Sequence, residues 1–365
     1  MSLHLPDHEA GLLFVGFNQD FGCFSVGLSD GFDIFNASPF GHAVSRSFPR
    51  GGLGHVEMLY RTNILALVGG GVVPAFPPNQ VVLWDDHTAS VLGQLKFREP
   101  VLAVKLSRER VVVVLRSVLF VYGLDSLEEQ GQFTTAENPL GVVSLSETHG
   151  VLACLALQEG HIRLEKFDER RNLIFKAHKS PVRALTLNSD GSLLVSASEK
   201  GTVIRIFNTH SDCTAPVQEL RRGAQPANIF SVNFSRESEF LCVCSDKGTV
   251  HVFGLREAVM SLAEGAAEEG DEKESGPKNP RSKFAFAGKF LPKYFQSEWS
   301  FAHFKGPDVP CICCFGNRMN TIVFLNSNGD YYELAFDPEK GGECKAASFH
   351  KFHQLEDSPA KDILA

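Results

Sequence analysis

The sequence predicts an all-β protein, a seven-bladed β-propeller with four antiparallel strands in each blade, and three observations support this. One hairpin pattern, in which an apolar run, a short polar turn and a second run end on an aromatic residue, occurs in seven copies. Most copies are spaced close to the ~40 to 45 residues of a four-stranded propeller blade. Helical periodicity is scarce, and its one strong instance covers residues 255–270. Each hairpin alone would expose an apolar face, so we expect one domain over residues 1–365 in which the copies close a ring.

The seven copies follow one another along the chain. Two match closely: residues 193–208 read LLVSASEKGTVIRIFN and residues 240–254 read FLCVCSDKGTVHVFG. In both, an apolar run precedes a Ser-acid-Lys-Gly-Thr turn and an alternating run follows it, as in a strand, a turn and a second strand. The other copies have the same order and lie at residues 23–36, 64–86, 110–123, 151–168 and 321–337.

The aromatic residues that close the copies give the period. They are Phe35, Trp84, Tyr122, Phe167, Phe207, Phe253 and Phe336. Neighbours in this series lie 38 to 49 residues apart, except for the last two, which lie 83 apart. The long spacing is one period plus an insertion, which we place in blade six at residues 256–296. Its DEKESGPKNPRSK stretch is too rich in charge, Pro, Gly and Ser to bury a core, so we expect the insertion to be partly disordered.

Composition and charge exclude several classes of protein. The chain is 43% apolar and 21% charged, as in a soluble globular protein. Its formal net charge of -8 argues against general binding of nucleic acid, which requires an excess of Lys and Arg. No stretch of about 18 apolar residues could cross a bilayer, and the start, MSLHLPDHEAG, lacks the regions of a signal peptide. We therefore expect a cytoplasmic protein with no nucleic acid among its partners.

The cysteines are expected to pack in the core. Several of the nine lie in apolar runs such as FLCVCSD and VPCICCFG, where a reduced thiol behaves as a small hydrophobic group. Cys311 and Cys314 form a C-x-x-C motif, but no second pair with the spacing of a zinc site follows. We therefore expect no metal site.

The segment ELRRG at residues 219–223 places two arginines side by side in an acidic protein. Neighbouring side chains of a strand point to opposite sides, so Arg221 and Arg222 are expected to face two separate anions. Gly223 would let the backbone turn or let a ligand approach closely. Each arginine has a Lys-Gly-Thr turn as a neighbour, and hydroxyls, turn N–H groups and cations are what a phosphate site needs.

Simpler interpretations compete with this one. An Arg-Arg pair is more often a solvated face, a Ser-Asp turn is mostly hairpin chemistry, and His251 in an alternating strand is more often a half-buried histidine than a ligand contact. The GGG at residues 69–71 lacks the Lys-Ser/Thr ending of a P-loop, and no pair of carboxylates indicates catalysis. We therefore expect neither an enzyme nor a cofactor. The residues alone leave open a phosphate-binding protein, a scaffold that binds only proteins and, less readily, a propeller enzyme.

The chain resembles the PROPPIN family, called WIPI proteins in animals, over almost its whole length outside the insertion and the termini. The segments that carry the resemblance are FNQD (17–20), VEMLYRTNILALVGGG (56–71), VVLWDD (81–86), ASEKGTVIRIF (197–207), ELRRG (219–223), CSDKGTVHVF (244–253) and FLPKYFQSEWSF (290–301). The resemblance implies a WD-repeat-like propeller that binds phosphatidylinositol 3-phosphate and phosphatidylinositol 3,5-bisphosphate at two rim sites.

The family motif, Phe or Leu followed by Arg-Arg-Gly, is matched here by Leu220 to Gly223. Carried over by this resemblance, the first phosphoinositide site consists of His178, Ser198, Thr202, Arg205 and Arg221. The second consists of Arg222, Ser245, Thr249 and His251.

The resemblance also implies a role at membranes and a protein partner. In the insertion of blade six, Phe284, Phe286 and Lys289 would meet the headgroup boundary, where aromatic rings bury and ammonium groups contact anionic lipid. Blades two and three would bind a segment of an autophagy lipid-transfer protein or a component of the conjugation machinery. The implied protein is a peripheral membrane adaptor of autophagosome formation and endolysosomal traffic, recruited from the cytoplasm to autophagosome-precursor, endosomal or vacuolar membranes. The alternative is a propeller scaffold that binds only proteins.

Overall fold

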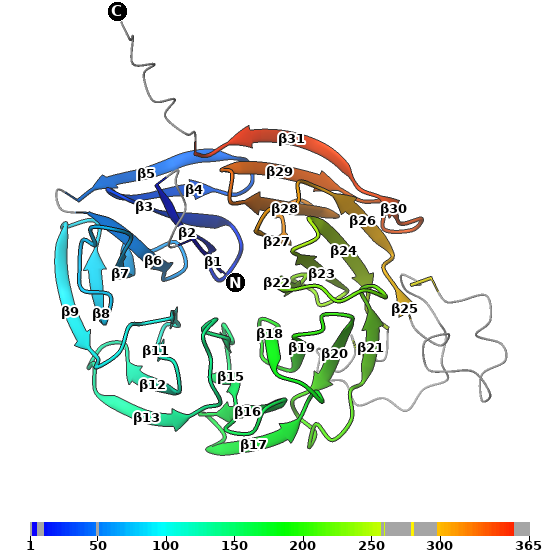
Figure 1. Ribbon diagram of the computed structural model, residues 1–365, viewed down its shortest axis with the longest axis horizontal. Helices are drawn as coiled ribbons and strands as arrows, with labels where there is room; N and C mark the ends of the chain where they lie inside the picture. The colour runs from blue at the N-terminus through cyan, green and yellow to red at the C-terminus, as the bar shows by residue number, and fades with distance from the viewer. Residues whose placement is uncertain are drawn as a thin grey trace, which may run out of the picture.

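The computed structural model describes residues 2–5, 11–48, 51–256, 259, 279–280 and 298–353. Seven sheets stand in a ring around a central axis, each with its strands arranged from the centre to the rim (Figure 1). The predicted seven-bladed β-propeller is therefore confirmed. Among the described residues, no helix is long and apolar enough to span a membrane.

The strands of the first four blades follow the chain from the inside outward. Blade one contains β1 (Ser2–His4), β2 (Leu12–Phe17), β3 (Cys23–Leu28), β4 (Gly31–Asn36) and β5 (Gly41–Ser47). Blade two contains β6 (Gly52–Met58), β7 (Ile64–Gly70), β8 (Gln80–Asp85) and β9 (Ser90–Lys96). Blade three contains β10 (Ala103–Leu106), β11 (Arg110–Val114), β12 (Val118–Gly123) and β13 (Glu129–Thr134). Blade four contains β14 (Val143–Leu145), β15 (Val151–Leu155), β16 (His161–Lys166) and β17 (Arg171–Lys176).

Two of the remaining blades take an outer strand from a later part of the chain. Blade five contains β18 (Val182–Leu187), β19 (Leu193–Ser198), β20 (Val203–Asn208), β21 (Gln218–Arg221) and β25 (Glu298–Trp299). Blade six contains β22 (Ile229–Phe234), β23 (Phe240–Ser245), β24 (Thr249–Gly254), β26 (Ala302–Lys305) and β30 (Gly342–Glu343). Blade seven contains β27 (Cys311–Phe315), β28 (Thr321–Asn326), β29 (Asp330–Ala335) and β31 (Lys345–Lys351).

The repeated hairpin of the sequence corresponds to the second and third strands of blades two to seven, and to β3 and β4 in blade one, where the short strand β1 is added at the inner edge. In blade five every residue of β19 is buried, whereas β20 mixes buried and half-buried positions. Blades pack face to face, so both faces of such a strand are covered and its sequence is largely apolar, with only small polar residues such as Ser196 and Ser198 in β19. The outer strands are largely exposed, as in β13, where no residue is buried. The burial gradient therefore explains why the two inner hairpin strands carried the repeat and the outer strands did not.

Side-chain packing closes the ring between blades seven and one. One core cluster combines Phe24 and Phe35 of blade one with Val323 and Tyr331 of blade seven. The hydroxyl of the fully buried Tyr331 donates a hydrogen bond of 2.6 Å to the carbonyl oxygen of Ala37. Blade one is built from the beginning of the chain and blade seven from its end, and no described strand belongs to both. These side-chain contacts therefore join the two ends of the propeller.

The prediction that the cysteines pack in the core is confirmed, since all nine are free and buried. In β27 the two residues of the C-x-x-C motif enter different core clusters: Cys311 packs between blades six and seven, and Cys314 packs between blades seven and one. Their thiols therefore face opposite sides of the strand and are not placed to share a metal ion.

Candidate functional site

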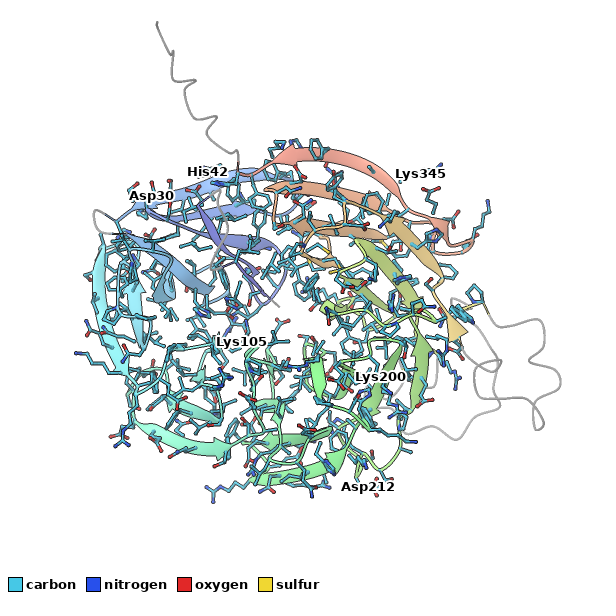
Figure 2. All side chains as sticks on the ribbon, viewed as in Figure 1. Asp30, His42, Lys105, Lys200, Asp212 and Lys345 are labelled. Carbon is cyan, nitrogen blue, oxygen red and sulfur yellow. The ribbon has the colours of Figure 1, made fainter. Side chains whose placement is uncertain are left out.

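The two Lys-Gly-Thr turns connect the second and third strands of blades five and six. Both glycines have a positive φ, 58° at Gly201 and 60° at Gly248. A Cβ at Gly201 would lie 1.9 Å from the carbonyl oxygen of Ala227, and one at Gly248 would lie 2.2 Å from that of Pro307. Only glycine fits such positions, where the turn passes directly against another backbone segment. Lys200, in the first turn, marks this part of the ring in Figure 2.

The arginine pair lies at the end of β21, beside the first of these turns. Arg221 is opposite Val203 in the antiparallel ladder between β20 and β21, and the Arg222 amide donates a hydrogen bond of 3.0 Å to Thr202 O. Gly223 has no positive φ, and a Cβ there would meet no atom within 4 Å. The backbone at Gly223 therefore does not use a conformation that only glycine adopts readily. The other predicted use of Gly223, close approach of a ligand, stays a prediction.

The two faces of blade five point toward different neighbours. On one face Ile204, Ile206 and Leu220 pack in a cluster with residues of blade six. On the other, Phe207 packs in a cluster with residues of blade four. Because side chains alternate along a strand, Arg221 lies on the blade-four face and the preceding Leu220 on the blade-six face.

Arg222 is directed to the blade-six side and is largely buried, with 8% of its surface exposed. Its Nε donates a hydrogen bond of 2.9 Å to the carbonyl oxygen of Gly201, and its Nη2 donates another to that of Gln225. Burial lowers the pKa of the guanidinium, while the negative charge of Asp246 in the second turn opposes this shift. The side chain is thus tied to the first turn and interacts electrostatically with the second.

The second predicted site surrounds this guanidinium. His251 of β24 is close enough that Arg222 contributes to its pKa of about 4, although burial is the larger cause and His303 adds a smaller one. Thr249 is half-buried, and its hydroxyl donates to Lys247 O at 3.3 Å, whereas Ser245 is fully buried. The structure therefore brings Arg222, which follows β21, close to His251 of β24. Thr249 lies two residues before His251 on the same strand.

Two buried side-chain atoms at this second site have no hydrogen-bond partner. They are Asp246 Oδ1 and His251 Nδ1, and in the part of the chain that the structure describes only one other buried side-chain N or O atom, Arg110 Nε, shares this property. Buried polar groups are nearly always paired, because leaving one unpaired is unfavourable by roughly 1–3 kcal/mol. Unpaired atoms beside a buried cation are typical of a place that a polar ligand completes.

The first predicted site lies on the opposite face of blade five. Arg205 of β20 forms an ion pair of 2.8 Å with Glu219 and donates a hydrogen bond of 2.6 Å from Nη1 to the carbonyl oxygen of Ala177, next to blade four. His178, the next residue, is buried, and its Nε2 lies 2.9 Å from the Ser196 hydroxyl. Burial and then the charge of Arg205 lower the pKa of His178 to about 4.

The structure brings part of this first set together. Arg205 and His178 are neighbours, and strand alternation puts Arg221 on the same face as Arg205, opposite Val203. Ser198 is largely buried at the end of β19, and Thr202 is half-buried in the turn. Arg205 is engaged by a protein carboxylate, so an anion at this site would compete with Glu219.

Sequence reasoning missed two groups beside the sites. Asp246 stands within the SDKGT turn and was explained by hairpin chemistry alone, although its position next to a basic pair was a usable signal. Glu219 is the residue before Leu220 of the motif, and its pairing with Arg205 follows directly from the β20–β21 register. Both carboxylates lower the positive potential that a phosphate would meet. The membrane-contact residues Phe284, Phe286 and Lys289 lie outside the described residues, as does nearly all of the helical pattern at 255–270.

Comparison with known proteins gives consistent results. The model of the family described as PROPPIN matches residues 11–353. Autophagy-related protein 18e of Arabidopsis thaliana is 36% identical over 355 residues, which are 95% of this chain and 89% of that protein. Autophagy-related protein 18 of Dictyostelium discoideum is 32% identical, with 92% of each chain covered.

Solved structures share the fold. Hsv2 of Kluyveromyces lactis superimposes with a TM-score of 0.73 at 22% identity, covering 93% of this chain and 98% of that chain. A structure described as the complex of KlAtg21 with the coiled-coil of AgAtg16 matches with a TM-score of 0.73 at 22% identity, over 94% of this chain and 99% of that one.

Proposed function

The chain belongs to the PROPPIN family, and from that premise we propose that it is a peripheral membrane adaptor that binds phosphatidylinositol 3-phosphate and phosphatidylinositol 3,5-bisphosphate. It would act in autophagosome formation and endolysosomal traffic, recruited from the cytoplasm to autophagosome-precursor, endosomal or vacuolar membranes. Its relatives are named as autophagy-related proteins, which supports this setting.

The observation that carries the proposal is the division of one Arg-Arg pair between two faces of a blade. Arg221 lies on the side of Arg205 and His178, and Arg222 lies on the side of Asp246 and His251. A guanidinium offers a planar fork of donors that matches phosphate oxygens, so each arginine can serve a separate headgroup. The two sites would share one strand and bind lipids of the same membrane.

The histidines would act as neutral donors rather than as cations. Burial lowers the pKa of both His178 and His251 to about 4, so both are uncharged at neutral pH. A neutral imidazole still donates one hydrogen bond, and Nδ1 of His251 is a buried atom that lacks a partner. In the second site the unpaired Asp246 Oδ1 can accept a hydrogen bond from an inositol hydroxyl, while Arg222 binds a phosphate. Such a site would recognise a phosphate next to a free hydroxyl.

We also propose that the insertion at 256–296 adds membrane contact through Phe284, Phe286 and Lys289. Each fully buried Phe would contribute roughly 1.5–3 kcal/mol and each lysine near the surface about 1 kcal/mol. Two weak contacts on one molecule reinforce each other, because the second occurs at a high effective concentration. Headgroup binding and insertion would therefore act together.

A protein partner is proposed for blades two and three. The structure of KlAtg21 with the coiled-coil of AgAtg16 supports binding of a protein partner, for which a component of the conjugation machinery and a segment of a lipid-transfer protein are the candidates. Arg108 of blade three lies 5.0 Å from the ring centre of Tyr60 of blade two, so these blades present a cation beside an aromatic ring. We propose no catalytic role. A scaffold that binds only proteins is the alternative, and it predicts no dependence on lipid phosphate.

Flotation with phosphatidylcholine vesicles, with and without 3-phosphorylated phosphoinositide, tests the proposal. The wild type is expected to float only with the phosphoinositide, and Arg221→Ala with Arg222→Ala is expected to abolish flotation while the protein stays folded. A matched control is Arg170→Ala with Arg171→Ala, which removes the same charge from another Arg-Arg pair, on the exposed rim of blade four. Equal loss in both double variants, or continued flotation of the first, would contradict the proposal.

A further inference from the structure

The end of the blade-six insertion is fastened to blade five. The chain leaves blade six after β24, and its returning part forms β25 (Glu298–Trp299) before it re-enters blade six as β26. β25 pairs in parallel with β21, with Glu298 opposite Leu220 and Trp299 opposite Arg221. Figure 1 shows β25 at the rim, beside β21. The segment that we propose as membrane-contacting therefore ends on the strand that carries the first arginine.

Glu298 is a buried carboxylate, with only 3% of its surface exposed, at the centre of a polar network that also includes the half-exposed Arg256. Arg256, which follows β24, donates to Glu298 Oε1 from Nε at 3.0 Å and from Nη2 at 2.5 Å. Gln218 of β21 donates to Oε2 at 2.7 Å and accepts a hydrogen bond of 3.2 Å from the Arg256 amide. The carboxylate thus joins the start of the insertion, its end and the outer strand of blade five.

A third part of the insertion enters the same network. Asn279 donates to Glu298 Oε2 at 3.2 Å, and its amide group forms two hydrogen bonds with the backbone of Gly254, of 2.8 and 2.7 Å. The carbonyl oxygen of Pro280 accepts a hydrogen bond of 2.9 Å from the Trp299 amide. Three points of the chain between Gly254 and Trp299 are therefore held at one place.

Burial makes this network cooperative. Desolvation opposes ionisation of Glu298, but hydrogen bonds from Arg256, Gln218 and Asn279 outweigh it and hold the pKa of the carboxyl below its usual value. A buried charge is stable only while its partners stay in place, so removal of one partner weakens the others. The network is thus expected to form or open as a unit.

We propose that Glu298 is a positioning residue that fixes both ends of the insertion on the strand bearing Arg221, so that the place of membrane contact is set relative to the headgroup site. The proposal rests on the proposed function, in which the insertion touches the membrane. What it adds concerns the position of the insertion. The insertion belongs to blade six in sequence, but contacts with blade five set the place from which it leaves the propeller. Without this anchor the two contacts are joined only by the chain itself, so the effective concentration of the second contact falls and the gain from their linkage is reduced.

Blade six offers a matched control. There β30 (Gly342–Glu343) pairs in parallel with β26, so it is also an added outer strand, with His303 opposite Glu343. Both residues of β30 are exposed, in contrast to the buried Glu298. Glu343→Gln therefore makes the same chemical change in an equivalent strand without touching the network.

The test compares Glu298→Gln, Arg256→Gln and Glu343→Gln in the full chain, using two binding measurements. One is flotation with phosphatidylcholine vesicles that contain phosphatidylinositol 3-phosphate. The other is calorimetric titration with the soluble headgroup, inositol 1,3-bisphosphate. For Glu298→Gln and Arg256→Gln we expect vesicle affinity to fall roughly tenfold, with headgroup affinity unchanged within about twofold. Glu343→Gln is expected to match the wild type in both.

A general structural role would lower both affinities together, and a passive Glu298 would lower neither; each of these results would overturn the proposal. Hydrogen exchange separates this outcome from a failure of the proposed function. If the wild type does not float at all, the function fails, but faster exchange at the Trp299 and Arg256 amides in Glu298→Gln would still establish the anchor. Unchanged exchange there would remove it.

Discussion

The two neighbouring arginines of blade five, Arg221 and Arg222, differ in burial and bonding on its two faces. Toward blade four, Arg221 is half-buried at the end of the outer strand β21, and Arg205 on the same face pairs with Glu219. Toward blade six, Arg222 is buried and bonded to two backbone carbonyl oxygens. One dipeptide thus supplies a side chain at the rim and a side chain that is part of the fold. Two adjacent arginines of one binding motif can therefore have different structural roles, even where the sequence suggests that they are equivalent.

The largest difference is expected in stability. Arg222→Ala leaves the carbonyl oxygens of Gly201 and Gln225 without their charged donor, and hydrogen bonds to charged groups contribute roughly 1.5–3 kcal/mol each. We expect a loss of about 3 kcal/mol in the free energy of unfolding, measured in urea. Arg221→Ala, at the half-buried position, is expected to lose about 1 kcal/mol or less. Equal losses for the two variants would show that the faces are equivalent after all.

The next effect is a dependence of stability on pH. Burial is the main reason that the pKa of His251 falls from 6.5 to about 4, so the unfolded chain binds more protons between these two values. As far as this histidine is concerned, the free energy of unfolding therefore has its full value above pH 6.5. It decreases as the pH falls toward 4, by about 1.4 kcal/mol per pH unit for one such histidine.

Between pH 6.5 and 5 this histidine would account for a loss of about 2 kcal/mol in the free energy of unfolding, and His251→Gln should remove that part of the loss. His178, with the same pKa of about 4 and a hydroxyl partner in Ser196, should contribute similarly on the other face. Urea unfolding at both pH values measures the slopes. If the slope is unchanged in His251→Gln, or in the corresponding His178→Gln, that histidine has the same pKa in the folded protein as in the unfolded chain.

The fold and the division of the arginines were both accessible from sequence, for one reason. A propeller repeats a strand pattern, and strands alternate their side chains, so both results need only short-range periodicity. The Ser245 and Thr249 pattern likewise located the second turn. The Glu298 network could not be predicted from the sequence, because Gln218 and Glu298 are 80 residues apart. They meet because the two-residue strand β25 pairs in parallel with β21, and no local sequence pattern predicts such a short pairing. Long-range additions to an edge strand therefore set the limit of this kind of sequence reasoning.

The smallest effects should come from the carboxylates that compete with a ligand for the arginines. Glu219→Gln frees Arg205 from a partly exposed ion pair, and such pairs contribute at most about 1 kcal/mol, so vesicle affinity should rise by roughly twofold to threefold. Asp246→Asn removes a charge beside the buried Arg222, where screening by water is weaker, but keeps Oδ1 as an acceptor for the inositol hydroxyl, so the rise should be somewhat larger, about fivefold. Flotation at low and high salt measures both, and the gain from Glu219→Gln should vanish first as salt increases. A fall in affinity for Asp246→Asn would mean that the carboxylate serves the ligand as an acceptor more than it repels it, and the second face would then select hydroxyl groups as strongly as phosphate.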